Sequence, residues 1–384
     1  MTFEEGTEIV YKPRGVEPGT LFYGILDRLD PHLSVSSFAT PTYLACDGYG
    51  WMEWIEHRPC SDEQAVARYY ERAGALVCLT YLLEFTDCHY ENLIAHGEYP
   101  VLVDCETIAH PFAATAASER LPELAPLVTE SIHLSLLLPF DVEPSDIDAD
   151  VDPAAVSKLG MEGMSGIGTD ADPVRLSAVT NPRIEAANTD VMSISHERPT
   201  IHRADNTPHL EGSAQRPGEY LDAIVTGFEE TYRTVRRLHE DGRFREEILR
   251  DGSLERIENR FVYRATRRYV SVIDALLSRD PLRDGVRFSV EMERLAAPFF
   301  TDLISDDRYW PIYERERAAL KRLDPPRITC HVDGRVPSFD GDPIRISVDR
   351  SGYDRCRRRL DSMSESDLRR QRRLLRECFD GTDR

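Results

Sequence analysis

The sequence predicts an α+β fold of two lobes, a small lobe with strands followed by a mostly helical large lobe, and three observations support this. A strand-like segment at residues 8–14 carries Lys12. A long stretch with apolar residues at helical spacing then runs into a polar loop, residues 87–92. A second apolar run, residues 101–103, ends at Asp104. Kinase folds place a strand lysine, a buried helix, a catalytic loop and a metal-binding Asp in this order, so the predicted fold is kinase-like.

The strand at residues 8–14 is expected to belong to a partial small lobe, residues 1–60. Lys12 stands at its end, where a kinase places the lysine that holds the nucleotide's phosphates. The chain has only three lysines, which favours a function for Lys12 over a solvated strand end, the alternative reading. A Gly-rich loop normally precedes this lysine, but only eleven residues do so here. We therefore expect the front of the small lobe to be missing.

Periodicity predicts the elements up to the polar loop. Residues 21–29 form a helix, and residues 43–46 and 51–55 form a hairpin around Asp47 and Gly48. Ser61, with Gln64 three residues later, predicts a capping box that starts a long helix. This helix opens the core of the large lobe, residues 61–140. Its apolar stripe is interpreted as core packing and comprises Val66, Tyr69, Tyr70, Ala73, Leu76 and Val77.

The polar loop has the residue types that phosphoryl transfer needs. Asn92 follows Asp87 by five residues, and Asp104 follows Asn92 by twelve. In such a site the first Asp accepts the proton of the attacking hydroxyl, while the Asn oxygen and the second Asp hold Mg²⁺. An acidic chain also produces Asp-rich loops by chance, but a strand-like run between Asn92 and Asp104 favours a site. His89 has two interpretations: it carries protons during the reaction, or it shapes the loop by hydrogen bonding.

Composition excludes several classes of function. The 384 residues and a hydrophobic content of 41% are enough to bury a core. The formal charge of −21 argues against binding nucleic acid or an anionic membrane surface. Eight scattered cysteines without a C-x-x-C pair predict reduced thiols and no structural zinc. The start of the chain lacks the pattern of a signal peptide, and the apolar runs are too short to span a bilayer. We therefore expect a cytoplasmic protein.

The rest of the chain is predicted as two regions. Residues 141–222 are rich in Asp, Pro, Gly and Ser and indicate an insertion with long loops. Within it, alternating acids at Asp146, Asp148, Asp150 and Asp152 lack the Gly and Glu of a calcium loop and predict a solvated acidic loop. Residues 223–384 are expected to be mainly helical. Basic clusters at 355–359 and 369–376 are interpreted as helix faces. In the last helix the acidic residues come first and the arginines come late, an order that complements the helix dipole.

Several motifs together resemble the dehydration domain of class II lanthipeptide synthetases, also called type 2 lantibiotic modifying enzymes. The matching segments are VYKPR (10–14), YYERAG (69–74), FTDCHYENLIAHGEYPVLVDCETI (85–108), SIHLSLLLP (131–139), NTDVM (188–192), GFEETY (227–232), NRFVYRATRRY (259–269) and MSESDLRRQRRLL (363–375). They are spread over nearly the whole chain. The resemblance implies a lipid-kinase-like fold and a helical inserted region. It also implies that ATP phosphorylates Ser and Thr of a ribosomally made precursor peptide, and that the same site then eliminates phosphate to leave dehydroalanine or dehydrobutyrine.

The resemblance also assigns roles to residues. Lys12 would contact the nucleotide, and Asp87 and His89 would serve phosphorylation. Asn92 and Asp104 would bind Mg²⁺, with Glu106 beside them at the nucleotide. Arg260 and Thr266 match the pair associated with elimination, where an Arg fork suits a departing phosphate and a Thr hydroxyl donates to it. Read without the resemblance, these last two lie on an ordinary helix or strand face of an arginine-rich segment.

Departures from the family leave three hypotheses. The resemblance implies several hundred residues before the Lys12 strand, with an upstream Asp and His for elimination, and a zinc-dependent cyclase domain after the dehydration domain. We expect a misplaced start, a separate chain that supplies the missing lobe or cyclase, or a decayed fragment. The first hypothesis is an ATP- and Mg²⁺-dependent peptide dehydratase. The others are a non-catalytic subunit that binds the precursor peptide and a phosphotransferase that stops before elimination.

Overall fold

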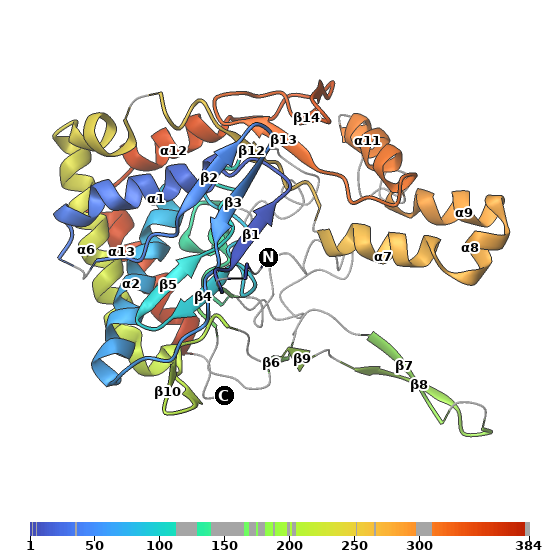
Figure 1. Cartoon of the computed structure of the whole chain (residues 1–384), viewed down its shortest axis with the longest axis horizontal. Coiled ribbons are helices and arrows are strands. Elements are labelled where there is room, and N and C mark those ends of the chain that lie inside the picture. Colours follow the sequence, from blue (N-terminus) through green and yellow to red (C-terminus); the bar gives the residue numbers. More distant parts are fainter. Residues whose placement is uncertain are drawn as a thin grey trace.

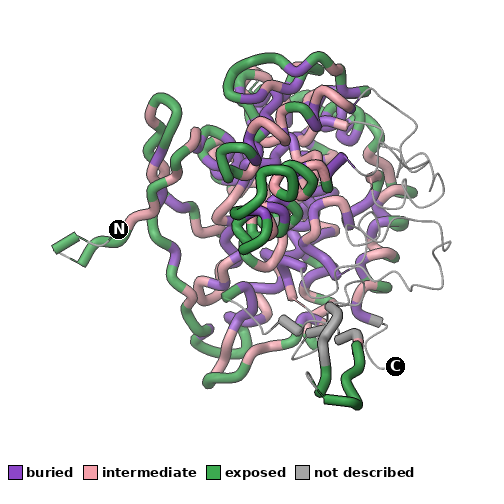
Figure 2. Tube along the Cα trace, turned by 90° about the vertical axis from the view of Figure 1, so that its right-hand side faces the viewer, coloured by how far each residue is buried: buried purple, intermediate pink, exposed green. Residues whose placement is uncertain are grey.

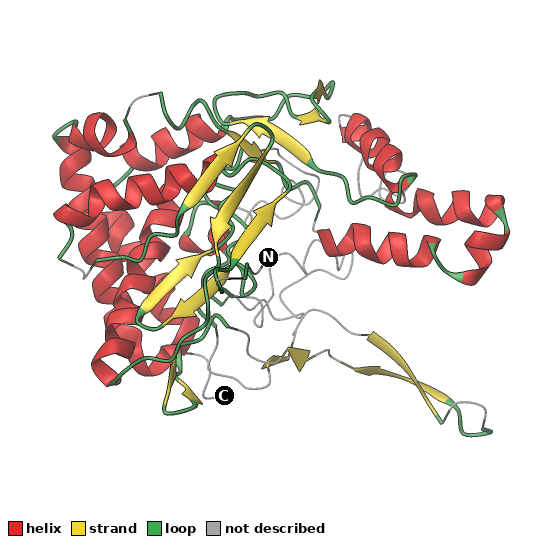
Figure 3. Cartoon of the chain, viewed as in Figure 1, coloured by secondary structure: helices red, strands yellow, loops and turns green. Residues whose placement is uncertain are grey.

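The computed structural model in Figure 1 describes residues 1–384 except 2, 5, 35–36, 113–128, 140–164, 169–173, 176–180, 187–188, 198–199, 202–204, 251, 265, 297–308 and 381–384. Long helices lie beside several small antiparallel sheets, as Figure 3 shows. The predicted α+β class is therefore confirmed, while the kinase-like division into two lobes stays a prediction.

The N-terminal part is a three-stranded sheet covered by one helix. β1 (Ile9–Lys12) pairs antiparallel with β3 (Tyr49–Glu53), which pairs with β2 (Tyr43–Cys46), so the predicted strand and hairpin are confirmed. The register places Lys12 opposite Gly50. α1 (Glu17–Leu29) begins four residues before the predicted start. A proline stands at its N-terminus, and the first turn of a helix is where proline is tolerated best.

The long helix α2 (Glu63–Leu82) confirms the predicted element but not its predicted cap. Asp62 Oδ1 accepts the hydrogen bond from the Ala65 amide at 2.7 Å, and Ser61 Oγ donates to Asp62 instead of capping the helix. The capping box of Ser61 and Gln64 is therefore wrong. A carboxylate at this position accepts an orphan amide hydrogen and complements the positive end of the helix dipole, which a serine hydroxyl does less well.

α2 is the central helix of the core and packs along α6 (Leu221–Glu240). Tyr69 and Tyr70 are fully buried, which confirms that the aromatic stripe is core. Gly74 and Gly227 let the two backbones touch. A Cβ at Gly74 would lie 1.9 Å from the Ile224 carbonyl oxygen, and a Cβ at Gly227 would lie 1.8 Å from a carbonyl oxygen of α2. Figure 2 shows the buried segments gathered in the centre of the molecule.

Beyond α2 the chain forms the polar loop and then a hairpin of β4 (Leu93–His96) and β5 (Tyr99–Leu102). The register pairs Leu93 with Leu102, so the loop before β4 and the segment after β5 lie at the same end of the hairpin. Gly97, with φ at +61°, makes the turn. The predicted strand that delivers Asp104 is thereby confirmed as the second strand of a hairpin.

The C-terminal helices α12 (Gly352–Asp361) and α13 (Glu365–Asp380) hold the chain just before the polar loop. Arg355 and Arg359 of α12 are buried and both donate to the buried carboxylate of Glu84. They are therefore core residues rather than part of a solvated face. α13 has the expected acids in its first turn but no base in its last, because the helix continues past its arginines.

Residues 261–348 contribute two buried clusters separate from the main core, seen at the right and top of Figure 1. This part contains α7 (Thr266–Leu276), α8 (Arg279–Arg283), α9 (Gly285–Met292) and α11 (Trp310–Leu320). A four-stranded sheet joins it, made of β12 (Glu258–Arg260), β13 (Ile328–His331), β14 (Ser338–Phe339) and β15 (Asp342–Pro343). The region expected to be a helical remainder thus also contains a sheet.

The remaining elements are short. The insertion contributes the pairs β6 (Val174–Arg175) with β9 (Thr200–Ile201), β7 (Asn181–Glu185) with β8 (Ser193–Glu197), and β10 (His209–Leu210) with β11 (Ser213–Ala214). Single turns of 3-10 helix span Asp30–His32, Ile132–Ser135, Pro217–Tyr220 and Glu293–Ala296, and a π-helical turn spans Phe244–Leu249. The predicted acidic loop with Asp146, Asp148, Asp150 and Asp152 lies outside the described residues.

Two further expectations concern the cysteines and the membrane. All eight cysteines are free thiols, as their scatter predicted. In the part of the chain that the structure describes, no helix combines the length and the apolar character needed to cross a bilayer.

Candidate functional site

The polar loop is held in place by its buried residue, Cys88. The Cys88 amide donates to the Ser135 carbonyl at 2.7 Å, and the side chain is fully buried. The residue before it, Asp87, has a positive φ of +63°, which is uncommon for a residue other than glycine and turns its side chain out of the core. Asp87 thus lies partly exposed next to the fully buried Cys88.

Asp87 and His89 face each other. His89 Nε2 lies 3.6 Å from Asp87 Oδ1, and the Glu91 amide donates to His89 Nδ1 at 3.3 Å. Because Nδ1 accepts, the proton of a neutral imidazole sits on Nε2, toward Asp87. The Glu91 contact favours the reading in which His89 shapes the loop.

The Asp87 carboxyl has a raised pKa. Burial is the largest cause, and the His89 and Arg260 charges lower the pKa against it, while the nearby Asp104 and Glu106 carboxylates raise it. A carboxylate held in a partly desolvated site with an elevated pKa is a stronger base than a solvated one.

Asn92 and Asp104 come together through the β4–β5 hairpin. The Val103 amide donates to the Asn92 carbonyl at 3.0 Å, which fixes Asn92 beside the end of β5. Asn92 Nδ2 donates to the Asp87 carbonyl at 2.7 Å, so its amide nitrogen faces the loop and Oδ1 is the atom left to bind a cation. The predicted pair therefore shares one end of the hairpin with Asp87.

The N-terminal strand brings cations to Asp104. Lys12 Nζ lies 3.8 Å from Asp104 Oδ2 and donates to the Val103 carbonyl at 3.3 Å. Arg14 Nη2 donates to the same Asp104 oxygen at 2.8 Å. The contact joins residues 90 positions apart in sequence. Lys12 thus reaches the predicted site, together with an arginine that the sequence reasoning did not select.

Glu106 is a bridge between two arginines. Arg260 Nη1 donates to Glu106 Oε1 at 2.8 Å, and Arg14 Nε lies 3.1 Å from Glu106 Oε2. Arg260 also donates to Thr266 Oγ1 at the start of α7. The predicted elimination pair is therefore in contact, and Glu106 links it to Asp104, because the Glu106 amide donates to Asp104 Oδ1 at 3.2 Å. The two Glu106 carboxylate oxygens themselves lie beside guanidinium groups.

The donor set of this site fits one hard divalent cation. Carboxylate and amide oxygens from Asp104 and Asn92 are ligands that Mg²⁺ prefers, and protein sites for it commonly supply only one or two carboxylates beside phosphates and water. Within the described ranges no group of three or more His, Cys, Asp or Glu side chains is arranged for a metal ion. Asp104 and Asn92 are therefore the residues that could hold such a cation.

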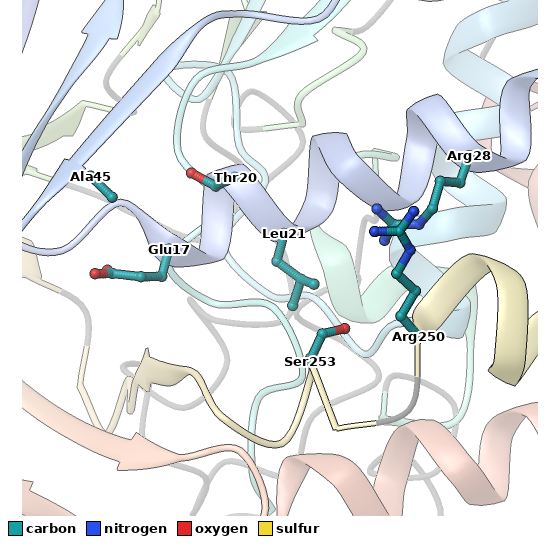
Figure 4. Close-up of a pocket in the computed structure, with 7 residues that line it drawn as sticks. All are labelled: Glu17, Thr20, Leu21, Arg28, Ala45, Arg250 and Ser253. Atoms are coloured by element: carbon teal, nitrogen blue, oxygen red, sulfur yellow. The ribbon is translucent and has the colours of Figure 1, made fainter.

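A separate hollow of about 320 Å³ lies away from this site, between α1, β2 and the segment after the π-helical turn. Figure 4 shows the Arg28 and Arg250 guanidinium groups side by side at one end, with Leu21 and Ala45 lining the rest. Burial lowers the pKa of Arg28, and the charge of Arg250 lowers it further. None of the predicted site residues lines this hollow.

Sequence reasoning missed Arg14 and Glu84. Arg14 lies two positions after Lys12 within the predicted strand, residues 8–14, so the alternation of faces could have suggested it, although β1 ends at Lys12 in the structure. Glu84 carries no such signal, because its partners lie 271 and 275 residues away in the sequence.

A family model described as a domain of unknown function, DUF4135, matches residues 1–331. The chain belongs to the DUF4135 family. This DUF4135 chain is also 24% identical over 361 residues to the lacticin 481/lactococcin biosynthesis protein LcnDR2 of Lactococcus lactis subsp. lactis. The alignment covers 88% of this chain but 35% of that relative, so the chain spans about a third of the relative's length. Together the two matches confirm that this DUF4135 chain is related to the class II lanthipeptide synthetases.

Proposed function

We propose that the chain catalyses ATP- and Mg²⁺-dependent dehydration of Ser and Thr in a ribosomally made precursor peptide, as a step of lanthipeptide biosynthesis. One observation carries the proposal. Arg260, 154 residues after Glu106, donates to Glu106 Oε1 at 2.8 Å, and the Glu106 amide donates to Asp104 Oδ1 at 3.2 Å. Arg260, Asp104 and Glu106 thus lie close enough to Asp87 for their charges to act on its carboxyl. The relationship to a lantibiotic biosynthesis protein supports the substrate class.

The first step is phosphorylation. Asp87, with its elevated pKa, accepts the proton of the Ser or Thr hydroxyl while that oxygen attacks the γ-phosphorus and ADP departs. Lys12 holds the nucleotide's phosphates from its strand end. Asn92 and Asp104 would hold Mg²⁺, which supplies charge compensation to the phosphates when bound. His89 keeps the Asp87 side chain oriented.

The second step is elimination. The Cα–H and Cβ–O bonds break and a Cα–Cβ double bond forms, giving dehydroalanine or dehydrobutyrine, while the Cα proton ends on the departing phosphate, which leaves as HPO₄²⁻. Arg260, fixed by Glu106 and in contact with Thr266, binds the departing phosphate through its planar fork. Both steps use neighbouring residues, so the phosphopeptide need not leave the site between them.

The same proposal assigns the parts of the chain. Residues 1–60 act as the small lobe with Lys12, and residues 61–140 contain the catalytic loop of a kinase-like large lobe. Residues 141–222 act as the insertion that contacts the peptide, and residues 223–384 complete the dehydration domain. The sheet that carries Lys12 and the hairpin that carries Asp104 meet at the site, which supports this division.

Mass spectrometry of a lanthipeptide precursor after incubation with the protein, ATP and Mg²⁺ tests the proposal. Loss of about 18 Da per modified residue supports dehydration, while a gain of about 80 Da means phosphorylation without elimination. Asp87→Asn should abolish both changes, and full activity in that variant would overturn the site. An unchanged peptide with the wild-type protein, together with binding of the peptide, supports a binding subunit instead.

A further inference from the structure

The Asp104 carboxylate is already neutralised by the protein itself. Its Oδ2 accepts from Arg14 Nη2 at 2.8 Å, and its Oδ1 accepts from the Glu106 amide at 3.2 Å. Both oxygens are therefore engaged. A divalent cation at this carboxylate would face the Arg14 guanidinium at contact distance, and like charges so close repel strongly in a partly buried site.

Arg14 has a second carboxylate within reach. Its Nε lies 3.1 Å from Glu106 Oε2, and the other Glu106 oxygen is held by Arg260. The Arg14 side chain is 28% exposed, whereas that of Glu106 is 9% exposed, so the guanidinium has room to turn and the bridging carboxylate does not. Arg14 can thus leave Asp104 while keeping its contact with Glu106.

Arginine side chains flank Glu106. Arg14 and Arg260 share this one carboxylate. Arg327, which precedes β13, also interacts electrostatically with this group: burial lowers the pKa of Arg327, Glu106 and Glu258 raise it, and Arg14 and Arg260 lower it. With Asp104 bound to a cation, Arg14 and Arg260 would share the one Glu106 carboxylate, and their planar guanidinium groups suit a phosphate.

We propose that Arg14 occupies the cation position on Asp104 in the nucleotide-free protein, and that a bound divalent cation displaces it toward Glu106, where it binds phosphate beside Arg260. This inference rests on the proposed function, since it assumes that Asp104 is the metal ligand. It makes Arg14 a second phosphate-binding residue and couples cation binding to the assembly of the phosphate site.

Equilibrium binding of Mn²⁺ alone, followed by electron paramagnetic resonance, tests the first half of the inference. Arg14→Ala should bind Mn²⁺ about tenfold more tightly than the wild type, because a charged hydrogen bond no longer competes for Asp104. Lys12→Met is the matched control. It removes the same charge 3.8 Å from the same oxygen but does not break a hydrogen bond to Asp104, so its gain should be smaller. An unchanged or weaker Mn²⁺ affinity in Arg14→Ala, or an equal gain in both variants, overturns the displacement.

Calorimetric binding of a non-hydrolysable ATP analogue at saturating Mg²⁺ tests the second half. Arg14→Ala should bind the analogue about tenfold more weakly, because a charged contact to phosphate is lost. Unaltered analogue binding overturns the phosphate role. Arg58→Ala, which removes an exposed arginine paired with Glu56, should behave as the wild type in both assays. Asp104→Asn distinguishes failure of the Arg14 displacement from failure of the proposed function. Mn²⁺ binding that survives this change refutes the metal site on which the proposed function depends.

Discussion

The substitution Glu84→Gln tests how the C-terminal helices hold the chain next to the polar loop, residues 87–92. The Glu84 carboxylate is 2% exposed and is the shared acceptor of Arg355 and Arg359, at 3.0 and 2.9 Å from their Nε atoms. Burial is the largest influence on the pKa of Arg359 and lowers it, but Glu84, Tyr81 and Glu130 together more than reverse this, so the pKa is raised. Removing the carboxylate's charge takes away the counter-charge that the two buried guanidinium groups share.

Removing one partner of a buried ion pair costs about 3–5 kcal/mol. We expect the lower end, because the Thr129 carbonyl also accepts from Arg359 Nη2 at 3.1 Å and remains in place. With a urea m-value of about 3 kcal/mol/M, a loss of about 3 kcal/mol lowers the unfolding midpoint by about 1 M. The change is therefore well outside the error of a denaturation curve.

Urea unfolding followed by circular dichroism measures the effect. Glu247→Gln is the matched control, since it removes a carboxylate from the exposed pair with Arg243 and should leave the midpoint unaltered. A midpoint for Glu84→Gln within about 0.3 M of the wild type would refute the reasoning, because it would mean that the buried guanidinium groups need no carboxylate.

Three further outcomes are expected. Gly74→Ala should destabilise the fold by about 1–3 kcal/mol in urea unfolding, because the alanine Cβ would lie 1.9 Å from a carbonyl oxygen of α6, even though alanine itself favours helices. Gly285→Ala in α9 is the control: its Cβ meets no atom within 4 Å, so this variant should not be destabilised. In a plot of phosphorylation rate against pH, the rate should fall off on the acid side at a pH above the ordinary Asp pKa of about 4, because Asp87 must be deprotonated and its pKa is raised. His89→Gln should move this fall to still higher pH, because the His89 charge lowers the Asp87 pKa, whereas a fall at or below about pH 4 in the wild type contradicts the prediction. Arg260→Lys should allow phosphorylation but slow elimination at least about tenfold, so phosphopeptide accumulates in the mass spectrum, and unchanged elimination would exclude the fork.

Local sequence determined the secondary-structure elements that carry much of the site. The strand with Lys12, the helix before the loop and the run that ends at Asp104 follow from short-range periodicity, and each appears in the structure. The family relationship could be read from motifs, because residue types that perform a reaction recur in order along the chain. Neither source required a three-dimensional contact.

Tertiary structure alone decided how these pieces are paired. The sequence placed Glu106 beside Asp104, and the fold in addition brings Arg14 and Arg260 to it from 92 and 154 residues away. The arginines of α12 were expected on a helix face, but the packing of α12 buries two of them against Glu84. Helical and strand periods report which face of an element is apolar, whereas an ion pair depends on which distant elements meet. That meeting is set by the packing of the whole core, so the sequence supplied the charges and only the fold determined their partners.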